Sequence, residues 1–131
     1  MSATDYLEQQ IINTHLRSQA TYVALCTADP TDTGSNEVTL GAFPAYARQA
    51  ADAGGLAGSG WTDPATSGQT KNVNKLTFPA FDGAVELAIT HWMVFDAGGN
   101  PLVYAPLQSP RTMRSGDRLI FDPDSLTVTI T

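Results

Sequence analysis

The alternation of polar and apolar residues at the end of the chain is the feature that most restricts its fold. In the closing stretch LTVTIT, three apolar residues alternate with three threonines: Leu126, Val128 and Ile130 against Thr127, Thr129 and Thr131. A period of two places the two sets on opposite faces of a β-strand, one buried and one in water. The pattern therefore predicts an antiparallel strand with one solvated face.

Further strand patterns precede this one and are separated by turn sequences. They are TYVALCTA (21–28), KLTFPAF (75–81), VELAITHWMVFD (85–96), PLVYAPL (101–107) and DRLIFD (117–122). The turns DAGGN, RSGD and DPDS consist of residues that tolerate tight or left-handed backbone. TYVALCTA is apolar throughout, which is typical of a strand buried on both faces. Pro79 cannot donate a ladder hydrogen bond, so the predicted strand at 75–81 should lie at an edge of the sheet or break at Pro79.

Short strands spaced by turns predict a mainly β fold, an antiparallel β-sandwich or jelly-roll-like domain. The chain has 131 residues, a common size for one domain, so we expect a single domain over residues 1–131. Residues 1–20 form its helical segment and residues 21–131 its sandwich. The signal is weak from Val38 to Gly60, where either a short helix or an irregular strand fits.

The N-terminal segment has helical rather than strand periodicity. Its apolar residues lie on one stripe: Leu7, Ile11, Ile12 and Leu16. Thr4 is suited to cap the helix, and Asp5 and Glu8 lie in the first turn, where the helix dipole favours negative charge. We predict an amphipathic helix of about four turns, whose narrow apolar face must dock on another surface.

Composition and charge exclude several classes of partner. The formal net charge is −6, and the seven basic residues are scattered, which argues against direct nucleic-acid binding. No apolar run approaches the roughly 20 residues that span a bilayer, so no membrane partner is expected. The start MSATDYLEQQ lacks the features of a secretory signal. We expect a protein that works in the cell that makes it, or leaves by another route.

The stretch THWMVFDAGGN contains a histidine, a tryptophan and an aspartate, a combination that raises the question of a catalytic or metal site. Strict alternation would place Ile89, His91, Met93 and Phe95 on one face of the strand. Among these apolar neighbours, His91 is expected to be a buried neutral imidazole, with an interface role or a catalytic role as the alternatives. Asp96 opens a turn and is expected to bind the backbone of that turn.

The other candidate groups also have structural interpretations. Cys26 lies in an apolar strand and should behave as a small hydrophobic residue rather than as a nucleophile. Two acidic loops offer solvated carboxylates or, alternatively, a weak Ca²⁺ site, although neither has EF-hand spacing: Asp29, Asp32 and Glu37, then Asp122 and Asp124. The glycines Gly54, Gly55, Gly58 and Gly60 match no phosphate-binding motif. We therefore expect no cofactor, no metal and no enzyme activity.

Several segments in a fixed order resemble one group of small tailed-phage virion proteins, usually labelled tail-fibre proteins. They are DYLEQQIINTHL, YVALCTADPTDTGSNEV, YARQ (46–49), THWMVFDAGGNPLVYAPL, SPRTMRSGDRLIF and DSLTVTIT. The similarity covers most of the chain from Asp5 onward and is weakest in the glycine-rich middle. It implies a structural protein of the virion, assembled in the cytoplasm of the bacterial host.

A compact domain lacks the coiled coil, triple β-helix or repeats that give a fibre its reach. We therefore expect a capsid decoration (cement) protein that stabilises the shell through many copies. The alternatives are a tail-fibre or tail-appendage subunit, and a receptor- or glycan-binding module with Trp61, Tyr46 and Tyr104 as its aromatic residues. A small enzyme with two carboxylates is a further alternative. The expected partners are the major capsid protein or tail proteins, and copies of the chain itself.

Five residues are predicted to make contacts with such partners: Leu7, Ile11, Trp61, Arg111 and Arg114. The first two represent the helix stripe. Trp61 lies in a glycine-rich loop; as a contact residue it would be an exposed anchor, although burial in the core is the favoured interpretation of the ring. The two arginines flank a turn and are suited to acidic partners, or else they are solvated strand ends. The long loops at 29–40 and 54–74 are the other expected contact regions.

Overall fold

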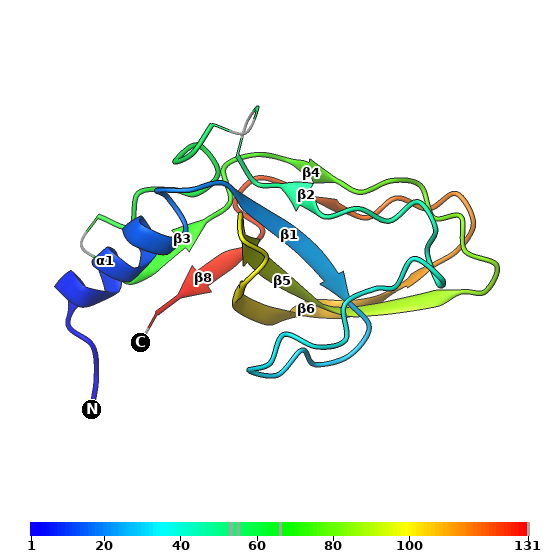
Figure 1. Cartoon of the computed structure of the whole chain (residues 1–131), viewed down its shortest axis with the longest axis horizontal. Coiled ribbons are helices and arrows are strands. Elements are labelled where there is room, and N and C mark those ends of the chain that lie inside the picture. The colour runs from blue at the N-terminus through cyan, green and yellow to red at the C-terminus, as the bar shows by residue number, and fades with distance from the viewer. Residues whose placement is uncertain (53, 55, 66, 131) are drawn as a thin grey trace.

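A four-stranded antiparallel sheet forms the main layer of this computed structural model, which describes residues 1–52, 54, 56–65 and 67–130. The strand order is β2–β1–β5–β6 (Figure 1). The strands are β1 (Thr21–Cys26), β2 (Gln49–Ala50), β5 (Leu87–Asp96) and β6 (Pro101–Met113). The long strand β6 therefore lies at one edge of the sheet, next to β5, with which it forms a hairpin.

Two short strand pairs pack against one face of this sheet. β3 (Gln69–Lys71) pairs with β8 (Thr127–Thr129), and β4 (Leu76–Thr77) pairs with β7 (Ile120–Phe121). The main core joins the layers, because Leu25 and Trp92 of the sheet belong to the same buried cluster as Phe78, Phe121 and Val128. The arrangement is sandwich-like, and the prediction of a mainly β, antiparallel fold is confirmed.

The predicted helix exists as α1 (Asp5–His15), but it is shorter than expected. Thr4 caps it by accepting a hydrogen bond from the Leu7 amide at 3.4 Å. The helix ends at His15 because the chain turns there. The Arg17 side chain reaches back to Asn13 Oδ1 at 2.8 Å and to the Trp61 carbonyl at 3.2 Å. Arg17 thus ties the end of the helix to a distant loop.

An irregular register between β5 and β6 corrects the predicted faces of β5. Between Ile89 and His91, β5 advances two residues while β6 advances five, from Arg111 to Pro106. Ile89 belongs to the main core with Trp92, whereas Met93 and Phe95 belong to a second buried cluster on the opposite face. The prediction that Ile89 shares a face with His91 was wrong, because strict alternation breaks at this irregularity.

The closing strand and the break near Pro79 agree with the prediction, whereas β6 extends to Met113, beyond the predicted end at 107, and within 117–122 the strand is limited to Ile120–Phe121. In the closing strand the side chains of Leu126 and Val128 are buried, while Thr127 and Thr129 are exposed; Thr131 lies outside the described residues. β4 ends at Thr77, two residues before Pro79. Beyond it the pairing continues only through two single hydrogen bonds. The Phe78 amide donates to the Leu119 carbonyl, and the Phe81 amide donates to the Asp117 carbonyl. The open question at 38–60 resolves as an irregular segment that contains β2.

The packing of α1 yields a first prediction. Ile12 is 0% exposed and Leu7 is 50% exposed, although both belong to the predicted stripe. Ile12→Ala should lower the free energy of unfolding by about 2–4 kcal/mol, because it removes buried methyl groups and leaves a cavity. Leu7→Ala should change it by about 0.5 kcal/mol or less, as for other surface substitutions. Urea denaturation measures both, and equal effects would contradict the docking of α1.

Candidate interaction surfaces

The predicted contact residues of α1 lie on its outer side. The side chains of Tyr6 and Leu7 are exposed. Ile11 is half-buried and lines a hollow of about 220 Å³ beside Leu102 and Val103 of β6. Ile11 therefore lines an apolar hollow against β6, whereas Leu7 is exposed on the helix, and the role of both as contact residues stays a prediction.

Trp61 is buried in the core, the interpretation that the sequence favoured, and it is not an exposed anchor. Its side chain is 1% exposed, and its indole N–H donates to Thr21 Oγ1 at 2.9 Å. The Trp61 carbonyl accepts a hydrogen bond from the Arg17 side chain. The glycine-rich neighbours therefore do not expose the ring, and Trp61 is not available as a contact residue.

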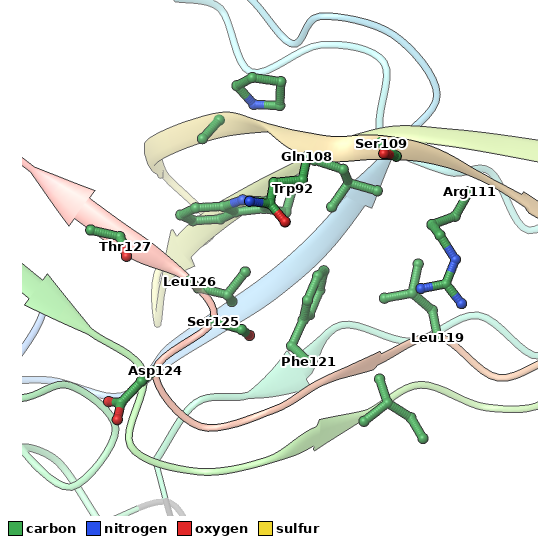
Figure 2. A pocket seen from close by; sticks show the side chains of 14 residues that line it. Trp92, Gln108, Ser109, Arg111, Leu119, Phe121, Asp124, Ser125, Leu126 and Thr127 are labelled. Atoms are coloured by element: carbon green, nitrogen blue, oxygen red, sulfur yellow. The ribbon is translucent and has the colours of Figure 1, made fainter.

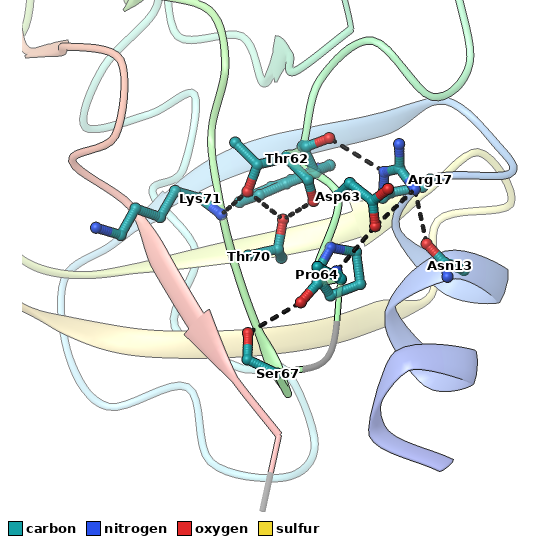
Figure 3. Close-up of polar contacts among 10 residues, drawn as sticks. Asn13, Arg17, Thr62, Asp63, Pro64, Ser67, Thr70 and Lys71 are labelled. Carbon is teal, nitrogen blue, oxygen red and sulfur yellow. Dashed lines mark hydrogen bonds and ion pairs between the residues drawn. The ribbon is translucent and has the colours of Figure 1, made fainter. Parts of the chain in front are cut away.

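The polar loop after Trp61 is held in place by its own threonines, and it contains the strand β3, which the sequence did not predict. Thr70 is buried and donates to the Thr62 carbonyl at 2.6 Å, while the Lys71 amide donates to Thr62 Oγ1 at 3.1 Å (Figure 3). Asp63 lies 4.0 Å from Arg17. Part of the predicted contact loop is thus scaffold; Gly55 and residue 66 lie outside the described residues.

Arg111 and Arg114 are both exposed, but their surroundings differ. Arg114 forms an ion pair with Glu86 at 3.0 Å, and its amide donates to Asp117 in the RSGD turn. The Arg111 guanidinium has no ion-pair or hydrogen-bond partner within the described residues. Arg114 therefore helps to hold its turn, whereas Arg111 is available to another molecule.

Arg111 lines a groove between the edge strand β6 and the segment that connects β7 to β8. The groove has a volume of about 740 Å³ (Figure 2). We call it the β6–β8 groove and define it by six lining residues: Trp92, Gln108, Arg111, Phe121, Asp124 and Thr127. In Figure 2, Arg111 and Asp124 lie at opposite ends, and Gln108 lies over the Trp92 ring. Sequence reasoning missed Trp92 and Gln108, because nothing in their spacing relates them to residues 121–127.

The opposite face of the main sheet is covered by a loop and by one arginine. Its buried cluster consists of Ala24, Cys26, Met93 and Phe95. Residues 29–37 fold over this face, and Gly34 has a φ of +69° at a point where a Cβ would lie 2.7 Å from Pro101. The Arg48 guanidinium stacks 3.6 Å from the centre of the Phe95 ring. β1 is thus buried on both faces, as its apolar run predicts.

Glu37 organises the polar contacts at this face. Its carboxylate accepts hydrogen bonds from Arg48 Nε and Nη2 at 2.9 and 2.8 Å and from the Tyr46 hydroxyl at 2.6 Å. The Tyr46 oxygen in turn accepts the Leu25 amide of β1 at 3.1 Å. Burial by itself would raise the pKa of Glu37, but the bonds and charge of Arg48 and the bond from Tyr46 outweigh it, so the pKa lies below its ordinary value.

The histidine and aspartate of THWMVFDAGGN contribute to the scaffold. His91 is half-buried rather than buried, with its Nδ1 2.8 Å from Thr90 Oγ1. Asp96 accepts the Asn100 amide at 2.8 Å, as predicted for a turn aspartate. That amide, and then the Asn100 side chain, lower the pKa of Asp96. The two side chains therefore serve the strand and its hairpin turn.

In the first acidic loop, two carboxylates accept hydrogen bonds, whereas the Asp122 and Asp124 carboxylates of the second accept none within the described residues. Asp29 Oδ1 accepts the Thr31 amide at 2.8 Å, and Asp32 Oδ1 accepts the Tyr104 hydroxyl at 3.3 Å. Among the described residues, no group of three or more His, Cys, Asp or Glu side chains is placed to hold a metal ion. Within the same residues, no helix is long and apolar enough to cross a membrane.

A sandwich-like scaffold whose polar side chains are tied into turns and ion pairs defines a small structural β-protein. Residues 2–129 match the family described as "Podophage GP4 fiber I protein gp80". The chain belongs to this family of tailed-phage virion proteins, which confirms the resemblance seen in the sequence. No curated protein matches the chain.

The Glu37 contacts predict a dependence of stability on pH. A carboxylate with a lowered folded pKa stabilises the fold above its unfolded pKa, about 4.5, and this contribution is lost as the pH falls through the folded value. Glu37→Gln should cost about 1–3 kcal/mol at pH 7 and less at pH 3. Glu86→Gln, which breaks the exposed pair with Arg114, should cost about 0.5 kcal/mol or less at either pH. Urea denaturation at several pH values measures these free energies of unfolding. A Glu37→Gln variant as stable as the wild type at pH 7 would contradict this account.

The burial of Cys26 predicts slow thiol chemistry. Burial, and then the charge of Glu37, raise the pKa of the thiol to about 12. Because the thiolate is the reactive form, a disulfide reagent at pH 8 should label the native protein only as fast as it unfolds. The same protein in urea should react at the rate of a free thiol. Rapid labelling without urea would show that the second face of the sheet is open.

Proposed function

We propose that this chain is a non-enzymatic structural subunit of the tail fibre, or of a tail appendage, of a tailed phage. The observation that carries the proposal is the family match, which extends over residues 2–129. The scaffold supports it, because Asp96, Glu37 and Cys26 are engaged in a turn, an ion pair and a buried cluster. Function then depends on the shape and chemistry of the surface.

The partners proposed for this subunit are other virion proteins and copies of the chain itself. Two surfaces of different character support this. The outer side of α1 is apolar around Leu7 and Ile11, whereas the β6–β8 groove combines apolar and polar groups around Arg111. A subunit held between neighbours needs more than one such surface, and repetition over many copies strengthens weak contacts.

Capsid decoration is the second candidate, and the compact architecture favours it. In the described residues, no strand exceeds the 13 residues of β6 and α1 has 11, and the sequence has none of the repeats that extend a fibre. A cement protein on the shell needs a rigid scaffold of this kind with ordered contact patches.

The geometry weakens the proposal of a receptor- or glycan-binding module. Of the three aromatic residues suggested for it, Trp61 and Tyr46 are buried, and Tyr104 is exposed. Sugar recognition by stacking requires open ring faces, and two of the three rings offer none.

Localisation on the phage particle separates the candidates. Gold-labelled antibodies against the purified protein should bind at the tail, and an excess of the protein should reduce adsorption of the phage to cells. Gold over the head, with a loss of heat resistance in particles that lack the protein, would support decoration instead. Absence of the protein from wild-type particles would contradict both candidates.

A further inference from the structure

We propose that the β6–β8 groove binds an extended, acidic peptide segment of another virion protein. The inference rests on the proposed structural function and deepens it by naming the kind of partner. The volume of the groove, about 740 Å³, lies within the range of about 300–1,000 Å³ that is usual for binding sites. The groove runs between the two layers, and each layer supplies one wall (Figure 2).

The floor of the groove contains a hydrogen-bond donor that the chain does not use. Trp92 is 5% exposed, yet its indole N–H has no acceptor within the described residues. The other buried tryptophan, Trp61, is satisfied by Thr21. The indole nitrogen is not fully buried, since within the described residues Asp52 Oδ1 is the buried side-chain N or O atom without a partner, so the Trp92 N–H reaches the water of the groove. A carbonyl or carboxylate oxygen of a ligand would replace that water.

The charged side chains at the two ends of the groove indicate which groups a ligand would place at each end. Arg111 has no partner in the described part of the chain, whereas Arg17, Arg48 and Arg114 each have a carboxylate nearby. Asp124 lies at the other end and is an acceptor. A ligand with a carboxylate at one end and N–H donors at the other complements this arrangement. An acidic residue within a peptide has both.

The edge strand favours a polypeptide over other ligands. From Pro101 to Pro110, β6 contains no charged residue, although exposed edge strands are commonly protected by charges. Pro106 and Pro110 protect only their own positions, since proline lacks the N–H. Residues 107–110 lie in the register shift against β5, so this part of the edge is irregular, and an extended peptide would meet its main-chain groups at single points, with the groove supplying specificity.

A saccharide fits the same groove less well. The aromatic residues on its walls, Trp92 and Phe121, are 5% and 7% exposed, so neither ring face is open for stacking on a sugar. A second copy of the chain also fits poorly. Its extended N-terminal residues 1–4 contain no carboxylate, and its acidic loop at 29–37 is held by its own hydrogen bonds. The occupant is therefore assigned to a different protein.

Site-specific crosslinking in assembled phage particles tests the assignment. A photo-crosslinking residue is placed in the groove (Gln108→p-benzoylphenylalanine) and, as the control, at exposed Val85 outside it. After illumination, mass spectrometry should identify, for position 108 only, a segment of another virion protein with Asp or Glu next to the crosslinked residue. The same segment captured from position 85 would contradict a specific groove.

A matched pair of arginine variants tests the charge. Arg118 is exposed and without a partner in the described residues, like Arg111, but it does not line the groove. Arg111→Gln should reduce the crosslink yield at position 108 about tenfold, equivalent to about 1.4 kcal/mol. Arg118→Gln should leave the yield unchanged. Equal thermal unfolding of the two variants shows that the fold is intact.

Other outcomes overturn the inference in distinct ways. A crosslink from position 108 to a second copy of the chain would assign the groove to self-association. Binding of a soluble acidic oligosaccharide that is lost in Arg111→Gln would assign it to a glycan. If the protein is present in particles and position 108 forms no crosslink, the inference fails while the proposed function stands. Particles without the protein would instead refute the proposed function.

Discussion

The fold depends on a hydrogen-bonded cluster around Glu37 that closes the second face of the main sheet. β1 is apolar throughout, so it needs cover on both sides. The two short strand pairs cover one side, and the loop at 29–37 covers the other. That loop is fixed because Glu37 holds Arg48 and Tyr46, and Tyr46 holds the backbone of β1 at Leu25. The polar cluster thus makes a doubly buried strand possible without a second complete sheet.

Other carboxylates of the chain also take the place of backbone partners. Asp52 accepts the Thr21 amide at 2.9 Å, and Asp96 closes the β5–β6 turn. Each carboxylate replaces a backbone partner at a point where a strand ends or lacks a neighbour, a common use of Asp and Asn side chains. The contacts proposed for this protein lie on the outer surface, at α1 and the β6–β8 groove.

Local patterns in the sequence predicted much of this fold and less of the surface. Alternation identified the closing strand, the apolar run identified β1, and the turn residues identified the hairpin at Asp96. The register shift between Ile89 and His91 was not predictable, because it depends on how residues 106–111 of β6 align with β5. The burial of Trp61 was the favoured interpretation, but its partner could not be predicted. Its glycine-rich neighbours suggest a loop, and burial depends on Thr21, which lies 40 positions away.

The candidate groove was beyond sequence reasoning for the same physical cause. It combines Trp92 and Gln108 of one layer with residues 121–127 of the other, and only the packing of the two layers brings them together. Two arginines illustrate what the sequence alone does not show. Arg111 and Arg114 look equivalent in the sequence, but the structure pairs Arg114 with Glu86 and leaves Arg111 facing the groove. Partner residues of this kind are recognised only from three-dimensional contacts.

Native-state hydrogen exchange measures the central claim, that polar side chains take the place of a neighbouring strand along β1. The amides of Thr21 and Leu25 donate to side-chain oxygens, those of Asp52 and Tyr46. If these side chains are part of the scaffold, both amides should exchange only with global unfolding. Their rates should then equal those of the amides that form hydrogen bonds between β1 and β5. Exchange of the Thr21 and Leu25 amides at the rate of exposed loop amides would contradict the account.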